Sequence, residues 1–499
     1  MAQIIASIFA EQSEQTLRLA TRAAMAGADW LELRLDRWPL DADLGALIGA
    51  IRLPVLVAIR TVDDGGAFRG TQSERRELFG RALAAGAQGI DLEHWETWTP
   101  SVGRNRLRLL VRSFHSFTGV PKDLHAIHDR LFDAQGTVAK LVVTAHDLAD
   151  IAPVLNLLAT IDQRARPTVA FAMGRTAWPS RVLACAFGAP YLYAAVESGQ
   201  ETAPDQPTVE EMAGLYRVRT LTGTTIVHGV LGNPALQSLG PWLHNRAFRR
   251  LGLDAIYLPF ETSRPEAVQA MLPRARLRGL SITAPHKQAM SAQCHRLSEE
   301  ASATGVVNTL TYEAHGLVVG HNTDVQGVLG ALAQKGVAKV ANGTRNAVVL
   351  GTGGAARAGV VALQQLGFAV TMLGRSLEPA RAFAQHHGVR LGSLQTRLLD
   401  ELVPAVVVHA TPVGSIGRDM NERLVPDWRP AAGTFVLDMV YQPRMTRLLL
   451  DAAAADAIPI PGALMFLTQA AAQLELFTGL QLPEAELRTF LAGTAASLS

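Results

Sequence analysis

The chain has 499 residues and a net charge of +2 at pH 7, and 48% of its residues are hydrophobic. This length predicts about two to four domains, and the balanced charge argues against nucleic acid or an anionic membrane surface as the main partner. Two cysteines, Cys185 and Cys294, exclude a disulfide framework and favour a reducing compartment. No group of histidine, cysteine and carboxylate residues has ligand spacing, so no metal is expected.

The first residues, 1–9, lack the basic start and long apolar core of a secretory signal. No apolar run reaches membrane-spanning length. We therefore expect a soluble protein of the cytoplasm that acts on small molecules.

Lysine is scarce in this chain. Of its 46 basic residues only five are lysine: Lys122, Lys140, Lys287, Lys335 and Lys339. Because arginine serves wherever a plain positive charge suffices, a lysine inside an apolar segment is more often present for its amine chemistry.

From residue 3 to about 220, short β-rich runs alternate with helical patterns such as 73–85 and 148–161. Eight strands are predicted, at Ile4–Phe9, Trp30–Asp36, Val55–Arg60, Gly89–Glu93, Leu107–Phe114, Val138–Ala145, Thr168–Met173 and Tyr191–Val196. Eight βα units in about 200 residues predict a compact (β/α)8 barrel, in which catalytic residues gather at the C-terminal ends of the strands.

Charged side chains do gather on these strands, at Glu32, Arg34, Arg60, Glu93, His115 and Lys140. Glu32 and Arg34 are two residues apart, so both face the same side of their strand. Burial in a barrel lowers the pKa of a lysine amine, which can then attack a ketone and form an iminium. Taken singly, Lys140 could equally reach solvent from a strand end, and His115 could be structural.

Together these residues resemble the type I 3-dehydroquinate dehydratase family over the first half of the chain. The resemblance rests on Glu32–Asp36, Arg60 with Asp64–Gly66, Asp91–Glu93, Ser113–His115, Lys140, Ser180–Arg181 and Ala203–Gln206. It implies that Lys140 forms the iminium, that His115 removes and returns protons, and that Glu93 holds the histidine ring.

The same resemblance implies the substrate contacts. Arg181 would bind the substrate carboxylate, and the hydroxyls would be bound by Glu32, Arg34, Arg60 and Gln206. Two residues depart from the family: Thr202 stands in place of a serine of the closing loop, and Ser116 in place of the aspartate that usually follows the histidine.

A polar, proline-rich segment, 201–211, closes the first half, and one more helix is expected to end near Arg219. The pattern restarts with a strand at Thr225–Val230. We therefore place the first domain at residues 1–221, with the boundary near 221–224.

In the second half, a strand at Asn346–Leu350 runs into a glycine-rich turn that includes Gly351, Gly353 and Gly354, and a helix then continues to about Leu366. A second strand follows at Ala369–Leu373. This order predicts a Rossmann domain over residues 344–460, whose glycines let the backbone approach a pyrophosphate.

The cofactor is predicted from the end of that second strand. An NAD site would carry an acidic residue there, but this chain has Gly374-Arg375-Ser376. A guanidinium suits a ribose 2′-phosphate, so NADP is favoured. The alternative is that Arg375 is only a solvated loop cation.

Lys287 ends the segment Ser281–Lys287, and Asp324 ends the segment His321–Asp324. Together they would form a proton donor tuned by a carboxylate, with a surface salt bridge as the alternative. With Val306–Thr309, these segments resemble the shikimate dehydrogenase family from about Thr225 to the C-terminus. Further matching motifs are Gly232–Pro234, Pro241–Asn245, Ala410–Gly414, Asp438–Gln442 and Gly462–Gln469.

This second resemblance implies hydride transfer between NADPH and C3 of 3-dehydroshikimate, with Lys287 and Asp324 as the catalytic pair. It implies substrate contacts from Ser238, Gly240, Thr283, Asn308, Tyr441 and Gln469. It adds cofactor contacts at Ala355, Ser376, Thr411, Val413 and Gly462.

The expected architecture is α/β throughout, a (β/α)8 TIM barrel followed by a two-lobed shikimate dehydrogenase. A substrate domain, 222–343, would be completed by a C-terminal helix within 461–499 and would be joined to the Rossmann domain.

Substrate choice in the second half stays open because of Gly240. Members that use shikimate carry a second serine at this position, and losing its hydrogen bond costs roughly 1.5–3 kcal/mol. Quinate, which carries an extra hydroxyl, is the alternative substrate.

Two further hypotheses are a regulatory homologue without activity and one active domain beside a scaffold. All five catalytic groups are present, which favours a bifunctional enzyme of consecutive steps. The oligomeric state is not predicted.

Overall fold

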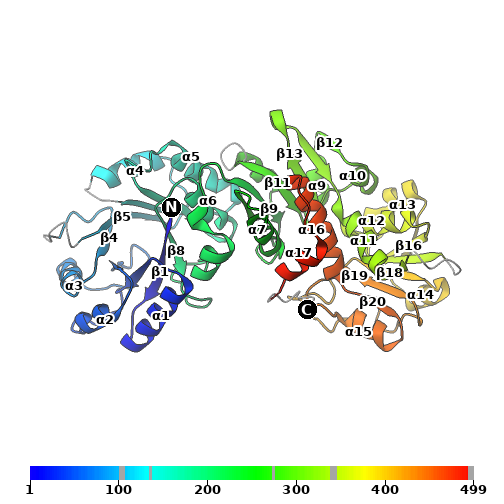
Figure 1. The fold of residues 1–499 in the computed structure, drawn as a ribbon, viewed down its shortest axis with the longest axis horizontal. Helices are drawn as coiled ribbons and strands as arrows, with labels where there is room; N and C mark the ends of the chain where they lie inside the picture. The colour runs from blue at the N-terminus through cyan, green and yellow to red at the C-terminus, as the bar shows by residue number, and fades with distance from the viewer. Residues whose placement is uncertain (101–106, 134–137, 272–275, 338–344, 493–499) are drawn as a thin grey trace. The chain divides into compact units, whose positions relative to one another are not determined.

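The computed structural model describes residues 1–100, 107–133, 138–271, 276–337 and 345–492. Figure 1 traces the chain from its blue N-terminus to its red C-terminus. It divides into two compact units: unit 1 holds Met1–Val227, Pro234–Leu236 and Asp254–Leu277, and unit 2 holds His228–Asn233, Gln237–Leu253 and Arg278–Ser499. The predicted boundary between the two lobes, at 343–344, and Lys339 lie outside the described residues, so those domain bounds stay predictions.

Unit 1 is built on eight parallel strands in the order β7-β6-β5-β4-β3-β2-β1-β8. They are β1 (Gln3–Phe9), β2 (Trp30–Arg34), β3 (Val55–Ala58), β4 (Gly89–Glu93), β5 (Leu109–Ser116), β6 (Val138–Thr144), β7 (Thr168–Met173) and β8 (Tyr191–Ala195). All eight predicted strands are confirmed, with ends that differ by at most two residues. The (β/α)8 architecture is therefore the observed one.

The helices between these strands cover the outside of the sheet (Figure 1). They are α1 (Ser13–Ala26), α2 (Leu44–Ala50), α3 (Gln72–Ala84), α4 (Leu124–Asp133), α5 (Ala152–Thr160) and α6 (Pro179–Ala186). The register of β5 and β6 aligns Ser113 with Lys140 and His115 with Val142. Because alternate strand residues share a face, these four side chains point to the same side, into the barrel.

Two predicted helices differ from the structure in detail. The segment 148–161 is helical as predicted, but its first turn, Leu148–Ile151, is a 3₁₀ turn, and the α-helical part begins at Ala152, just before Pro153. The helix expected to end near Arg219 is instead a π-helical turn, Glu211–Leu215, and a 3₁₀ turn, Val218–Thr220. Arg217 separates these two turns with a left-handed φ of 47°, which no continuous helix allows.

A six-stranded mixed sheet follows in the order β10-β9-β11-β13-β14-β12. Its strands are β9 (Ile226–Gly232), β10 (Ala255–Glu261), β11 (Leu277–Ile282), β12 (Arg296–Leu297), β13 (Thr309–Tyr312) and β14 (Val318–His321). The helices of this region are α7 (Gly240–Arg250), α9 (Lys287–Ser291), α10 (Glu299–Thr304) and α11 (Thr323–Gln334).

A second six-stranded sheet, all parallel, has the order β17-β16-β15-β18-β19-β20. Its strands are β15 (Asn346–Leu350), β16 (Ala369–Gly374), β17 (Arg390–Ser393), β18 (Val406–His409), β19 (Phe435–Asp438) and β20 (Ile458–Ile460). This is the doubly wound order of a Rossmann domain, with β15 and β18 at the switch point.

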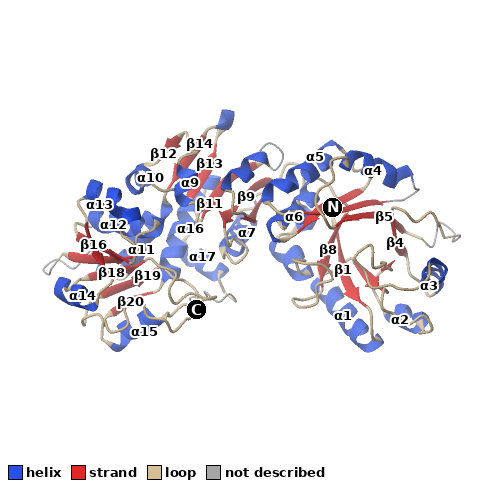
Figure 2. Cartoon of the chain, turned by 180° about the vertical axis from the view of Figure 1, so that it is seen from behind, coloured by secondary structure: helices blue, strands red, loops and turns tan. Residues whose placement is uncertain are grey.

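Both faces of the parallel sheet are covered by helices, as Figure 2 shows. These helices are α12 (Gly354–Gln365), α13 (Arg381–His387), α14 (Thr396–Leu402) and α15 (Arg447–Ala454). Val349 and Val408 pack in the core with α12 and α13, whereas the neighbouring Leu350 and Val407 pack with α14 and α15. Burial on both faces explains why these strands are continuous apolar runs.

The chain then returns in α16 (Gly462–Thr478) and α17 (Glu484–Phe490). Helix α16 packs along α11, and two glycines of α11 make the close approach possible. A Cβ at Gly327 would lie 2.9 Å from the carbonyl oxygen of Met465, and one at Gly330 would lie 2.6 Å from Thr468 Cγ2. No helix in the described part of the chain is long and apolar enough to cross a membrane.

Candidate active sites

Side chains of the barrel strands line one cavity of about 130 Å³. The predicted residues that line it are Glu32, Arg34, Arg60, His115, Lys140, Arg181, Thr202 and Gln206. They come from β2, β5 and β6, from the end of β3, from α6 and from the loop after β8. The fold therefore brings together groups that are far apart in sequence.

Lys140 lies at the centre of the charged side chains. Its Nζ donates to Asp91 Oδ2 at 3.0 Å and lies 3.7 Å from Glu32 Oε1. The ring of Tyr193 lies beneath the same nitrogen, with its centroid 3.7 Å away. The side chain of Lys140 is only 6% exposed, so its nitrogen faces the cavity and little bulk water.

Asp91, predicted only as part of a sequence motif, is the main partner of that lysine. It accepts hydrogen bonds from Arg60 at 2.5 Å and from Ser113 Oγ at 2.6 Å. Burial would raise the pKa of Asp91, but the charges of Arg60 and Lys140 outweigh it, so the pKa lies well below its ordinary value.

Glu93 does not hold the histidine ring in this structure. Its carboxylate is fully buried and is ion-paired with Arg60 at 3.1 Å and with Arg75 of α3. It does not line the cavity, and the Nδ1 atom of His115 has no hydrogen-bond partner among the described residues. The predicted Glu93–His115 contact is therefore absent from the described residues, and Glu93 instead pairs with Arg60, which lines the cavity, and with Arg75 behind it.

His115 is half-buried, and cations lie close to it. Burial, and then the charges of Arg60 and Lys140, lowers the pKa of His115 well below its ordinary value. The imidazole is thus neutral near pH 7 and can accept a proton.

Asp64, a second carboxylate for which no role was predicted, lines the same cavity and accepts hydrogen bonds from Thr61 and Trp95.

Arg181 lies deep in the wall and forms no ion pair with any residue that the structure describes. It is 4% exposed, its guanidinium stacks over the ring of Phe171 at 4.5 Å, and it donates a hydrogen bond to the carbonyl oxygen of Pro204 at 3.4 Å. Burial lowers the pKa of Arg181 to about 10. A buried cation that faces a cavity and forms no ion pair among the described residues is a site for an anion such as a carboxylate.

In unit 2, Lys287 begins α9 and Asp324 lies in the first turn of α11. Lys287 Nζ donates to Asp324 Oδ2, and Asn308 Nδ2 donates to Asp324 Oδ1 at 2.8 Å. Thr323, which was not predicted to act, completes the arrangement: its N–H donates to Asn308 Oδ1 at 2.8 Å. Three predicted residues therefore meet, and Asp324 is fixed by two partners.

Of the other predicted substrate residues, Gln469 of the returning helix α16 contacts this group. Gln469 accepts a hydrogen bond from Thr323 Oγ1 at 3.3 Å. Tyr441 is half-buried and stacks on Phe466 of α16 with the ring centroids 4.9 Å apart. The N–H of Thr283 donates a hydrogen bond to the carbonyl oxygen of Leu231. The hydroxyl oxygen of Ser238 accepts a hydrogen bond from the N–H of Gly240, the first residue of α7.

The glycine-rich turn has the backbone that a dinucleotide requires. Gly351 has a φ of 126°, and a Cβ there would lie 2.9 Å from the carbonyl oxygen of Ala410. Gly353 precedes the free N–H groups of α12, and its own Cβ position is open, so a pyrophosphate can reach the helix N-terminus. Gly354 lies against the Lys287 side chain, and a Cβ there would lie 3.5 Å from Lys287 Cδ.

The remaining predicted cofactor residues follow β16 and β18 or begin α16. Arg375 and Ser376 are exposed just past β16, and Arg375 has no ion pair among the described residues, which leaves it available for a 2′-phosphate. Val413 is buried and donates its N–H to Thr411. Gly462 begins α16, where a Cβ would lie 2.5 Å from the carbonyl oxygens of Asp438 and Val440. The residues present fit NADP.

Two family models match this chain. The model described as type I 3-dehydroquinase matches residues 4–222, and that of the shikimate dehydrogenase substrate-binding domain matches residues 230–310. The first match covers the barrel with Lys140, and the second covers part of the mixed sheet together with α9, which begins at Lys287.

Curated relatives extend the same comparison. The chloroplastic bifunctional 3-dehydroquinate dehydratase/shikimate dehydrogenase of Arabidopsis thaliana is 29% identical over 96% of this chain and 83% of that protein. A shikimate dehydrogenase (NADP(+)) of Halobacterium salinarum is 40% identical over 53% of this chain and 98% of that protein. Shikimate 5-dehydrogenase of Thermus thermophilus, solved with NADP(H) and shikimate, is 32% identical over 53% of this chain and 98% of that chain, with a TM-score of 0.47.

Proposed function

Because this chain belongs to the family of type I 3-dehydroquinate dehydratases joined to shikimate dehydrogenases, we propose that its two sites catalyse consecutive steps through the residues assembled above. The barrel dehydrates 3-dehydroquinate to 3-dehydroshikimate, and unit 2 reduces that product to shikimate with NADPH. Lys140 and His115 carry the first reaction, and Lys287 and Asp324 carry the second.

In the barrel, the Lys140 amine attacks the C3 ketone and water leaves, so an iminium forms. His115, which is neutral, removes a proton from C2, and the resulting enamine expels the C1 hydroxyl as water with a proton returned by His115. Hydrolysis of the iminium then frees the product and the amine. Asp91 holds the lysine nitrogen, and Arg181 binds the substrate carboxylate.

In unit 2, NADPH supplies a hydride to the ketone carbon when it is bound. Lys287 delivers a proton to the ketone oxygen, and Asp324 keeps its nitrogen in place. Asn308 holds the other carboxylate oxygen of Asp324, and Thr323 holds Asn308. The contact between Lys287 and Gly354 places the proton donor beside the first turn of the dinucleotide helix.

One observation carries the proposal for the barrel: buried Lys140 and buried Arg181 line the same cavity. The first is a nucleophile held among carboxylates, and the second is a cation that forms no ion pair in the described part of unit 1. A substrate with a ketone and a carboxylate satisfies both.

Chemical trapping tests this assignment. Borohydride added with 3-dehydroquinate should reduce the iminium and leave a stable mass on the peptide that contains Lys140. The exposed Lys122 serves as the internal control and should stay unmodified. A chain that turns over 3-dehydroquinate without any adduct on Lys140 would contradict the Schiff-base assignment.

The cofactor assignment is tested by Arg375→Ala. Its removal should raise the KM for NADPH about tenfold or more, because a charge-assisted contact to the 2′-phosphate is lost, and should leave the KM for NADH unchanged. An equal rise in the KM values for NADPH and NADH would show that Arg375 does not bind the 2′-phosphate.

The compartment is proposed to be the cytoplasm. The two cysteines, Cys185 and Cys294, are unpaired, which agrees with a reducing environment. Fractionation of the source cells, with detection of the chain in each fraction, tests this location.

A further inference from the structure

We propose that His409 is a positioning residue for the dinucleotide: it orients the Thr411 hydroxyl and thereby holds the loop after β18 against the glycine-rich turn. The inference deepens the proposed function, because it rests on NADP binding by unit 2.

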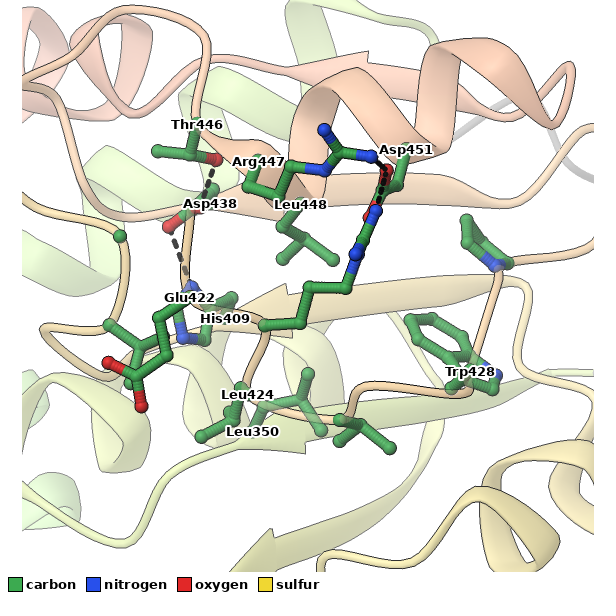
Figure 3. A pocket seen from close by; sticks show the side chains of 15 residues that line it. Leu350, His409, Glu422, Leu424, Trp428, Asp438, Thr446, Arg447, Leu448 and Asp451 are labelled. Atoms are coloured by element: carbon green, nitrogen blue, oxygen red, sulfur yellow. Dashed lines mark hydrogen bonds and ion pairs between the residues drawn. The ribbon is translucent and has the colours of Figure 1, made fainter. Parts of the chain in front are cut away.

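His409 ends β18 and is 1% exposed. Its Nδ1 lies 2.8 Å from Asp438 Oδ1, and its Nε2 lies 2.5 Å from Thr411 Oγ1. Asp438 ends the neighbouring strand β19 and also accepts the hydroxyl of Thr446 at 2.6 Å. Figure 3 shows Asp438 between His409 and Thr446, with both contacts drawn as dashed lines.

The hydrogen bonds assign the donors and acceptors of this group for a neutral His409 ring. Asp438 accepts the N–H of Val440 as well, at 3.0 Å, so its carboxylate acts as an acceptor throughout. His409 Nδ1 must then donate, and in the neutral ring Nε2 is left as an acceptor. Thr411 Oγ1 accepts the N–H of Val413 at 3.3 Å and donates its own proton to His409.

The other face of Thr411 touches the dinucleotide turn. A Cβ built on Gly351 would lie 3.2 Å from Thr411 Cγ2, so the threonine methyl group packs directly beside that glycine. Gly351 opens the turn into α12. One side chain therefore joins the buried His409–Asp438 pair to the backbone that would hold the pyrophosphate.

The far part of the same loop is held separately. Arg423 donates to Asp451 of α15 at 2.6 Å, and Arg447 pairs with Asp451 at 2.8 Å. Thr446, the N-cap of α15, links this helix to Asp438. Helix α15 thus holds the far part of the loop. The first residues of the loop are held by the Ala410 N–H, which donates to the carbonyl oxygen of Leu350 at 2.8 Å, and by the contact of His409 with Thr411.

A small cavity of about 30 Å³ lies beside His409, lined by residues that include Leu350, Leu424 and Trp428. Figure 3 shows these side chains around it. This volume holds about one water molecule and no metabolite. The network therefore serves to place the loop rather than to bind a second ligand.

The test compares NADPH dissociation constants, measured by nicotinamide fluorescence in the full chain. His409→Asn keeps a donor for Asp438 but is too short to reach Thr411, and Thr411→Val keeps the methyl packing but removes the hydroxyl. Each should weaken NADPH binding about 3- to 10-fold. The double variant should be no weaker than the worse single variant, because both changes break one link. Thr411→Ser keeps the hydroxyl but loses the methyl group beside Gly351, so it should recover only part of the affinity.

His386→Asn is the matched control, since His386 is exposed on α13; its NADPH affinity should equal that of the unaltered chain. For His409→Asn, kcat at saturating NADPH should stay near that of the unaltered chain while the KM rises, which a variant that had lost its fold would not show. Nitrogen NMR of ¹⁵N-histidine-labelled chain without dinucleotide should give a protonated Nδ1 and an unprotonated Nε2 for His409.

Unchanged affinity in both single variants, additive losses in the double variant, or a protonated Nε2 in the unaltered chain would each overturn the inference. If the unaltered chain binds no NADPH, the proposed function of unit 2 fails, and this inference fails with it. If the unaltered chain binds NADPH and the variants bind it equally well, only the inference fails.

Discussion

The two active sites both depend on a lysine beside a carboxylate, but the surroundings of those lysines differ. Lys140 is in the middle of a barrel strand, its side chain is 6% exposed, and Asp91, Glu32 and the Tyr193 ring surround its nitrogen. Lys287 begins a short helix, its side chain is 19% exposed, and one carboxylate, Asp324, pairs with it.

The difference matches the chemistry proposed for each site. A nitrogen that forms a covalent bond must return to the same place in every cycle, and a rigid strand with several partners provides that. A nitrogen that passes a proton must reach both a substrate and exchangeable water, and a partly exposed helix start provides that. A lysine can therefore serve as a nucleophile or as a proton donor, depending on the strand or helix that carries it and on the residues around it.

The largest expected effect is the loss of dehydration in Lys140→Ala. Without the amine no iminium can form, so kcat for dehydration should fall about 10³-fold or more. Reduction of 3-dehydroshikimate by the same sample should be unchanged, as should both activities in Lys122→Ala. Residual dehydration within tenfold of the unaltered chain would place the chemistry elsewhere.

Lys287→Ala is the corresponding test of the active site in unit 2. Loss of the proton donor should lower kcat for ketone reduction roughly 10²–10⁴-fold. Dehydration of 3-dehydroquinate should be retained, and the exposed Lys335→Ala variant is the control for both assays. An equal drop in dehydration would mean that the two sites are not independent.

Arg181→Met tests whether the barrel cavity recognises a carboxylate. The buried guanidinium forms no ion pair among the described residues, so its loss should raise the KM for the dehydratase substrate roughly 10- to 100-fold, with a smaller effect on kcat. Arg164→Met removes an exposed arginine and should leave the KM unaltered. Steady-state kinetics measure both, and an unaltered KM in Arg181→Met would remove this residue from the substrate site.

Gly240→Ser addresses the substrate of unit 2. The added hydroxyl at the first residue of α7, two positions after Ser238, restores a hydrogen-bond donor and should lower the KM for shikimate about tenfold. Shikimate and quinate oxidation are compared under identical conditions. A higher KM for shikimate in the variant would show that the open position at Gly240 is itself needed for binding.

The smallest effect concerns pH. Because burial and two neighbouring cations lower the pKa of His115, the ring stays neutral as the pH falls through its ordinary value of 6.5. The kcat/KM for dehydration should therefore hold at pH 6.5 and fall only in more acidic buffers. Arg60→Met removes one of those cations and should move the acid limb upward. An acid limb at or above pH 6.5 in the unaltered chain contradicts the proposed environment of His115.

Much of the fold could be predicted from the sequence, because its signals are local. The buried parallel strands are apolar runs with clear ends, and the strand–glycine–helix order of 346–366 indicated the Rossmann domain. The rim of the barrel was predicted for the same reason: residues such as Arg34 and Arg60 lie where strands end.

What could not be predicted are partners brought together by tertiary packing. Glu93 pairs with Arg75, which extends from a helix 18 residues earlier in the chain, and no motif marks that contact. The His409–Asp438 pair joins two strands 29 residues apart, and nothing in either strand indicates a buried hydrogen bond. Strand ends are set by local sequence, whereas ion pairs depend on which elements pack together.

The most direct test of the central claim supplies purified protein with 3-dehydroquinate and either NADPH or NADH, and follows enone absorbance and nicotinamide oxidation together. We predict that 3-dehydroquinate drives NADPH oxidation, and that Lys140→Ala or Lys287→Ala stops it at the first or the second step. Enone that accumulates without NADPH oxidation would contradict the account, because unit 2 would then act on a different substrate.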